Sequence, residues 1–127
     1  MKFLQKYEEE IYVALRIVAG FLLLWHGSQK LLGFPPSSNS APATVKYIAG
    51  GIELIGGLFV MTGFLTRWAG FLASGLMAFA YWMAHGTNAL LPIQNGGELA
   101  ALYCFVFLFI AAKGSGKFSL DKIFFPK

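Results

Sequence analysis

Four long apolar runs are the feature that most limits how this chain of 127 residues can fold. The runs cover residues 11–25, 48–65, 68–84 and 99–112. A helix that crosses the hydrocarbon core of a bilayer needs about 20 apolar residues, with a range of roughly 17–25. The second and third runs meet that length as they stand. The first and the fourth reach it only if their helices continue through the ionisable residues at their ends.

The composition agrees with lipid as the solvent. Hydrophobic residues make up 57% of the chain and charged residues only 13%, whereas soluble domains carry about 25% charged residues. We therefore expect an all-α membrane protein in which one domain, residues 1–127, forms an antiparallel bundle of four transmembrane helices. The expected helices cover roughly residues 8–32, 46–64, 67–85 and 97–113. Gly63 is the expected end of the second helix, and Thr66 the expected N-cap of the third.

The basic residues predict how such a bundle is oriented. With four spans, one side of the membrane receives Lys2, Lys6, Arg67, Lys113, Lys117, Lys122 and Lys127, and the other receives Lys30 and Lys46. Lysine and arginine are enriched in cytoplasmic loops, so both termini are expected in the cytoplasm. This topology accounts for the formal charge of +4, and no nucleic-acid partner is expected.

Every predicted helix brings a polar group to the outer third of the bundle. The candidates for ligand binding or proton relay are His26, Gln29, Lys30, Glu53, His85 and Glu98. The first three are spaced by three and four residues, which places them on one helix face. Each also has a structural interpretation, because Lys30 can snorkel to the interface and a histidine can bind a neighbouring helix. Glu53 is the hardest to explain structurally, since an isolated carboxylate among apolar neighbours requires a partner.

Two further polar residues are interpreted as structural. Asn95 and Glu98 have the spacing of a capping box, with Asn95 as the N-cap of the fourth helix. Arg16 lies about 15 Å along the first helix from His26, toward the cytoplasmic side. We expect Arg16 to snorkel inward or to pair with one of the acidic residues 8–10.

No cofactor or metal site is evident in the sequence. The chain has no CxxCH, CxxC or HxxxH motif and a single cysteine. His26 and His85 lie on different predicted helices and could together ligate a haem, but both are expected near the outer surface, so haem is disfavoured. The sequence also lacks a plausible Ser-His-Asp set and any self-contained catalytic motif, which leaves enzymatic activity an open question.

Four motifs, in order, resemble the DoxX family of small prokaryotic membrane proteins. They are Arg16 with residues 25–31, residues 50–58 with the turn 63–67, residues 95–100, and the tail 114–121. The resemblance implies four helices in the inner membrane of a prokaryotic cell. Some members of the wider family are described as subunits of a terminal quinol oxidase or of a thiosulfate:quinone oxidoreductase. Others are linked to membrane-associated redox stress complexes.

The outer polar cluster favours a redox-linked subunit that binds a quinone or a similar apolar small molecule. Quinone reduction needs proton donors beside an apolar pocket, and a carboxyl group and a histidine suit that role. The chain has no evident electron carrier, so a redox protein partner would supply the electrons. Two alternatives remain open, a non-enzymatic scaffold or assembly component and a small-solute transporter. A transporter of only four spans would need a homo-oligomer.

Overall fold

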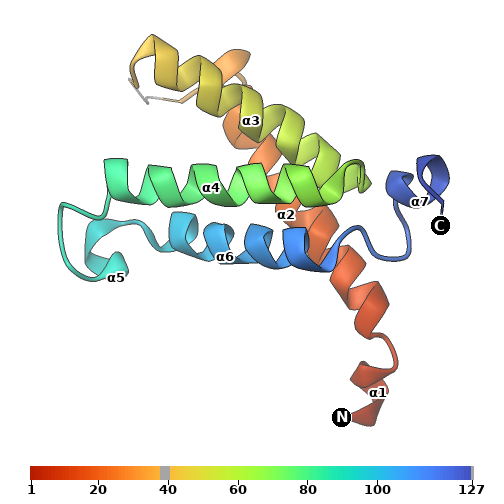
Figure 1. Ribbon diagram of the computed structural model, residues 1–127. Coiled ribbons are helices and arrows are strands. Elements are labelled where there is room, and N and C mark those ends of the chain that lie inside the picture. The colour runs from red at the N-terminus through yellow and green to blue at the C-terminus, as the bar shows by residue number, and fades with distance from the viewer. Residues whose placement is uncertain (38–40, 127) are drawn as a thin grey trace.

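The computed structural model describes residues 1–37 and 41–126, and this part of the chain is helical, without a strand. The helices are α1 (Lys2–Gln5), α2 (Glu8–Leu31), α3 (Ala43–Thr62), α4 (Thr66–Ala84), α5 (Pro92–Asn95), α6 (Glu98–Lys113) and α7 (Leu120–Phe124). The four long helices alternate in direction, and α4 and α6 run side by side (Figure 1). The all-α prediction is thus confirmed. Part of the expected first loop, residues 38–40, and Lys127 lie outside the described residues.

Two of the described helices are long and apolar enough to cross a membrane. They are α2, with 24 residues, and α3, with 20. Helix α4 has 19 residues and α6 has 16. At 1.5 Å per residue, α6 extends about 24 Å, which is less than the roughly 30 Å of a hydrocarbon core. Length and hydropathy together therefore support two spans, α2 and α3.

Helices α2 and α3 pack closely because glycines lie where their backbones meet. A Cβ atom on Gly20 would lie 2.5 Å from the backbone nitrogen of Met61, and one on Gly57 would lie 2.7 Å from that of Leu24. Gly51 differs, because open space surrounds the position of its missing Cβ. Small residues that let backbones approach are a common means of helix association in membranes.

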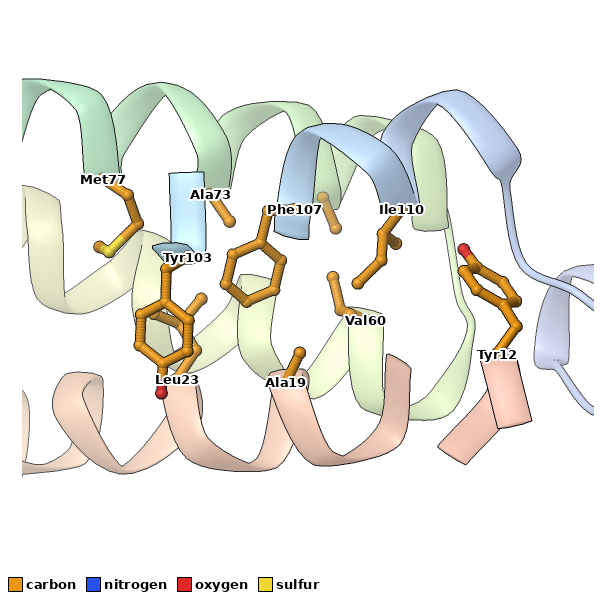
Figure 2. Packing of buried hydrophobic residues seen from close by; sticks show 10 residues of the cluster. Tyr12, Ala19, Leu23, Val60, Ala73, Met77, Tyr103, Phe107 and Ile110 are labelled. Carbon is orange, nitrogen blue, oxygen red and sulfur yellow. The ribbon is translucent and has the colours of Figure 1, made fainter. Parts of the chain in front are cut away.

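The buried core lies between α2 and α3 on one side and α4 and α6 on the other (Figure 2). Leu23 of α2, Val60 of α3, and Phe107 and Ile110 of α6 are fully buried. Ala73 of α4 completes this layer and is also fully buried. Hydrocarbon is as apolar as leucine, so close packing rather than exclusion of water would hold such a core together in a bilayer.

The turn between α3 and α4 is fixed by a residue far along the chain. Gly63 ends α3 in the left-handed conformation, with φ 74°, as expected. Thr66 is not the N-cap of α4, because Leu65 holds that position and the helix begins at Thr66. The carboxylate of Asp121 accepts hydrogen bonds from the backbone nitrogens of Leu65 (2.7 Å) and Thr66 (3.0 Å) and from the Thr66 hydroxyl (2.9 Å). The cap is thus supplied by the C-terminal segment.

We call this end of the molecule the termini end, because both termini lie on this side of it (Figure 1). Arg16 is buried at this end, only 1% exposed. Its guanidinium donates hydrogen bonds to carbonyl oxygens of Val60 (3.0 Å) and Phe118 (2.7 Å), and also to those of Met61 and Ser115. The expectation that Arg16 snorkels or pairs with residues 8–10 is therefore wrong. The arginine instead joins three segments through their backbones.

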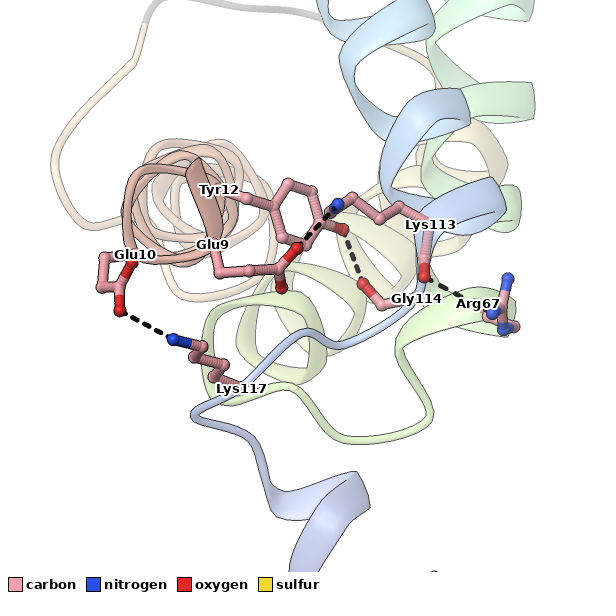
Figure 3. Close-up of polar contacts among 7 residues, drawn as sticks. All are labelled: Glu9, Glu10, Tyr12, Arg67, Lys113, Gly114 and Lys117. Carbon is pink, nitrogen blue, oxygen red and sulfur yellow. Dashed lines mark hydrogen bonds and ion pairs between the residues drawn. The ribbon is translucent and has the colours of Figure 1, made fainter. Parts of the chain in front are cut away.

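The acidic start of α2 is paired with the C-terminal segment (Figure 3). Lys113 lies 3.1 Å from Glu9, and Lys117 lies 2.8 Å from Glu10. The hydrogen bond to Glu10 raises the pKa of Lys117 above its ordinary value. The Tyr12 hydroxyl donates a hydrogen bond of 2.6 Å to the Gly114 carbonyl oxygen in the same region. These contacts place the start of α2 beside the end of α6 and the segment that follows it.

Candidate functional site

A buried ion pair joins α2 and α3 toward the opposite end, where residues 32–37, 41–42 and 85–97 lie and which we call the loop end. The Lys30 ammonium lies 2.6 Å from one carboxylate oxygen of Glu53 and 2.8 Å from the other. The side chain of Glu53 is 5% exposed and that of Lys30 is 19% exposed. Lys30 thus turns to Glu53 rather than to the surface. Pairing with Lys30 lowers the cost of burying the Glu53 carboxylate, which would be high for an unpaired one.

The ion pair lines a cavity of about 580 Å³ between the four long helices. Most of the wall is apolar, with Leu23 of α2, Ala49 of α3, Met77 of α4 and Leu99 of α6 among the lining residues. A cavity of this size falls within the range of small-molecule sites, which are mostly apolar with a few placed polar groups. Four of the residues singled out by the sequence line it: His26, Lys30, Glu53 and His85.

The cavity rim between α3 and α4 is apolar and exposed. Val45 and Ile48 of α3 are 41% and 60% exposed, and Phe79 and Met83 of α4 are 54% and 68% exposed. All four line the cavity. An opening with such a rim suits entry from an apolar phase, because water gains nothing from contact with these side chains.

His26 faces the cavity with its ring nitrogens unpaired. Within residues 1–37 and 41–126, its ring contacts Tyr103 edge to face, with centroids 6.3 Å apart, and takes part in no hydrogen bond. Tyr103 of α6 is buried and lines the same cavity. The sequence analysis missed Tyr103, because a tyrosine inside an apolar run is indistinguishable from a core residue. Only its position opposite His26 marks it.

His85 is held at the loop end by the segment that precedes α6. Its Nδ1 lies 3.1 Å from the Asn95 carbonyl oxygen. The Asn95 side chain donates to the Tyr81 hydroxyl at 3.0 Å and to the Ala89 carbonyl oxygen at 3.2 Å, and it accepts from the Gly97 nitrogen at 2.8 Å. Asn95 therefore fixes the loop that positions His85, in agreement with a structural role.

Gln29 and Glu98 are not part of this cavity. Gln29 lines a smaller polar hollow of about 270 Å³, which His26 and Lys30 also line from the other side. Glu98 is exposed at the start of α6. The capping box is wrong, because Gly97 is the N-cap and no side chain caps this helix. Gly96, at φ 75°, ends α5 and separates Asn95 from the helix that it was expected to cap.

Comparison with known proteins identifies the family. The family model described as DoxX matches residues 11–86, more than half of the chain. The chain belongs to the DoxX family. This match makes it a DoxX membrane protein, and the matched stretch contains His26, Lys30, Glu53 and His85. Helix α6, with Tyr103, lies beyond it.

Two relatives of this DoxX protein come from Haemophilus influenzae, and both carry the description "uncharacterized protein". One is 39% identical over 134 residues, covering all of this chain and all of the relative. The other is 31% identical over 91 residues, which are 71% of this chain and 60% of the relative. No solved structure matches the chain.

Proposed function

We propose that this DoxX protein is a multi-pass protein of the prokaryotic inner membrane, with four spans and both termini in the cytoplasm. Within the described residues, the termini end carries the side chains of Arg67 and Lys113, and the loop end those of Lys30 and Lys46. The basic terminal segments add to this asymmetry, and the positive-inside rule then assigns the termini end to the cytoplasm. In this arrangement the cavity lies in the outer part of the bundle.

We infer that the cavity binds a quinone or a similar apolar small molecule. The observation that supports this most strongly is a mostly apolar cavity into which a buried ion pair and an unpaired imidazole project. A quinone has a flat apolar ring and oxygen atoms that accept protons on reduction. Glu53 and His26 are groups that can hold or move such protons. The exposed apolar rim between α3 and α4 suits a ligand that is dissolved in the bilayer.

The redox step itself would need a partner. Reduction of a quinone to a quinol consumes two electrons and two protons. The side chains of the cavity handle protons, and a redox protein bound to this subunit would supply the electrons. The proposal is therefore a quinone-linked subunit rather than a self-contained enzyme.

Binding of a short-chain benzoquinone to the purified protein in lipid nanodiscs tests this function. In Glu53→Gln we expect the dissociation constant to rise at least about tenfold, the consequence of losing one charged hydrogen-bonding group. The matched control is Glu98→Gln, because Glu98 is exposed and lies outside the cavity. Absence of binding by the unchanged protein, or an equal loss in both variants, would contradict the proposal.

One observation favours a second function, that of a non-enzymatic scaffold. Both carboxylate oxygens of Glu53 are already satisfied by Lys30, and a buried pair can serve solely to fix how two helices associate. A scaffold predicts that Glu53→Gln lowers the melting temperature in detergent while quinone titration gives no heat with either protein. The same titration thus separates the two functions.

A further inference from the structure

We propose that the hydroxyl group of Tyr103 is the hydrogen-bond donor that selects an oxygen-bearing ring as the ligand of the cavity. This inference rests on the proposed function and specifies the chemistry of the ligand. It assigns to α6 a residue that neither the polar motifs nor the family match includes.

The Tyr103 ring is held in place by its neighbours. Its side chain comes from the middle of α6, and the residue is 7% exposed. The ring packs edge to face against His26, at 6.3 Å between centroids, and tilted against Phe107, at 5.6 Å. Figure 2 shows the ring reaching from α6 toward α2, with its hydroxyl at the α2 side of the core. A ring fixed in this way presents its hydroxyl in a defined direction.

The hydroxyl of Tyr103 differs from those of other tyrosines in what it binds. Tyr12 is buried to a similar extent and donates to the Gly114 carbonyl oxygen at 2.6 Å. Tyr81 accepts a hydrogen bond from Asn95 at 3.0 Å. In the described part of the chain, the Tyr103 hydroxyl has no such partner. Phenylalanine would fill the same space, so the hydroxyl group is the one feature of Tyr103 that packing does not explain. Because Tyr103 lines the cavity, its hydroxyl is placed to donate a hydrogen bond to a molecule bound there.

The positions of the polar groups restrict what that partner is. Tyr103 and His26 stand at the α6 and α2 walls, and the Lys30–Glu53 pair joins α2 to α3. A ligand that hydrogen-bonds to both groups carries two oxygen atoms at separate positions on one apolar ring or chain. A ring with two carbonyl groups, as in a quinone, meets this requirement. A plain hydrocarbon or an acyl chain does not.

The test combines a variant with a change in the ligand. Tyr103→Phe removes only the hydroxyl and keeps the ring contacts. We expect its dissociation constant for a short-chain benzoquinone to rise about tenfold, which is typical of one lost hydrogen bond. Binding of the same ring with both carbonyl oxygens replaced by hydrogen should not change. Tyr47→Phe is the control, because Tyr47 is 64% exposed and lies outside the cavity lining.

The possible results separate this inference from the function on which it rests. If the unchanged protein binds neither ligand, the proposed function fails and this inference fails with it. If the unchanged protein binds the benzoquinone but Tyr103→Phe binds it equally well, only the role of Tyr103 is overturned. A variant that melts at a lower temperature and binds both ligands more weakly would assign Tyr103 a purely structural role, which also overturns the inference.

Discussion

Two polar residues at each end of the bundle differ in how their hydrogen-bonding groups are used. At the termini end, Arg16 donates to carbonyl oxygens of four residues, and Asp121 accepts from three donors. At the loop end, His26 and Tyr103 face a cavity and contact each other through their rings, without a hydrogen bond to described residues. A saturated cluster stabilises one conformation, whereas unsatisfied groups beside a cavity are free to bind something else.

The difference also separates two uses of charge. Arg16 forms no ion pair within the described residues, and its hydrogen bonds go to backbone carbonyl oxygens, so its effect is to join α2, α3 and the C-terminal segment. Lys30 and Glu53 neutralise each other and leave one side open to the cavity. Substitutions at the termini end should therefore change stability alone, while those at the loop end should change binding as well.

The largest effect is expected for Arg16→Met. The substitution keeps an apolar stem but leaves several buried carbonyl oxygens without a donor, each of which carries a desolvation cost. We expect the free energy of unfolding to fall by about 3 kcal/mol or more. Reversible unfolding with SDS in mixed micelles measures it.

Arg67→Met is the matched control for Arg16. Arg67 is exposed, and it donates to carbonyl oxygens of Ala111, Ala112 and Lys113 at the end of α6. Loss of an exposed cation at a helix C-terminus costs about 0.3–1 kcal/mol. Equal destabilisation by the two substitutions would show that burial of Arg16 is not what gives it its importance.

The next effect is expected for Glu53→Gln, which leaves Lys30 without a counter-charge. Removing one partner of a fully buried ion pair costs about 3–5 kcal/mol, and we expect about 1–3 kcal/mol here because Lys30 is partly exposed. The cost should lie below that at Arg16, because Lys30 is 19% exposed and also borders the outer polar hollow. Unfolding in mixed micelles again gives the value.

The double variant Lys30→Met with Glu53→Leu sharpens this measurement. Replacing a buried pair by apolar residues of similar size is often neutral for stability. We therefore expect the double variant to recover most of the stability that Glu53→Gln loses, and yet to bind no benzoquinone. If the double variant loses as much free energy of unfolding as the two single variants together, the Lys30–Glu53 pair has a structural role like that of Arg16.

The helical fold could be predicted from the sequence because each of the four apolar runs forms most of one long helix. That Glu53 needs a partner also followed from the sequence, because an isolated carboxylate among apolar neighbours is costly. Tyr103 could not be predicted as a cavity residue, because only the three-dimensional structure shows that its hydroxyl has no hydrogen-bond partner among the described residues.

Other parts of the structure depend on backbone atoms, which a residue pattern does not record. The partners of Arg16 are carbonyl oxygens as far away as residue 118, and carbonyl groups are present at every position of a chain. The cap of α4 comes from Asp121, which is 55 residues beyond Thr66. The capping box at Asn95 failed because the left-handed Gly96 places a break between Asn95 and α6.

A smaller effect is expected for Asp121→Ala. The substitution removes the side-chain cap of α4, and loss of such a cap costs about 0.5–2 kcal/mol. Hydrogen exchange at the Leu65 and Thr66 amides should accelerate, while benzoquinone binding at the other end stays unchanged. Ser119→Ala is the control, because Ser119 caps only the five-residue α7. Weaker benzoquinone binding in Asp121→Ala would contradict the separation of the two ends.

The smallest effect is expected for Lys117→Ala at the surface of the termini end. Lys117 and Glu10 are 49% and 42% exposed, and exposed ion pairs contribute little. The pKa of Lys117 is raised by its hydrogen bond to Glu10, so any stabilisation is present at neutral pH and is lost only as pH rises through that raised value, above 10.5. We expect no measurable change in melting temperature at pH 7 in physiological salt.

Lys122→Ala serves as the comparison, because the Lys122 side chain forms no ion pair in the described part of the chain. The two variants should have the same melting temperature at pH 7. A clear drop in melting temperature for Lys117→Ala alone would show that the surface ion pairs also stabilise the termini end. The stabilising network would then extend from Arg16 to the surface, and the contrast between the ends would rest on the number of paired groups as well as on their burial.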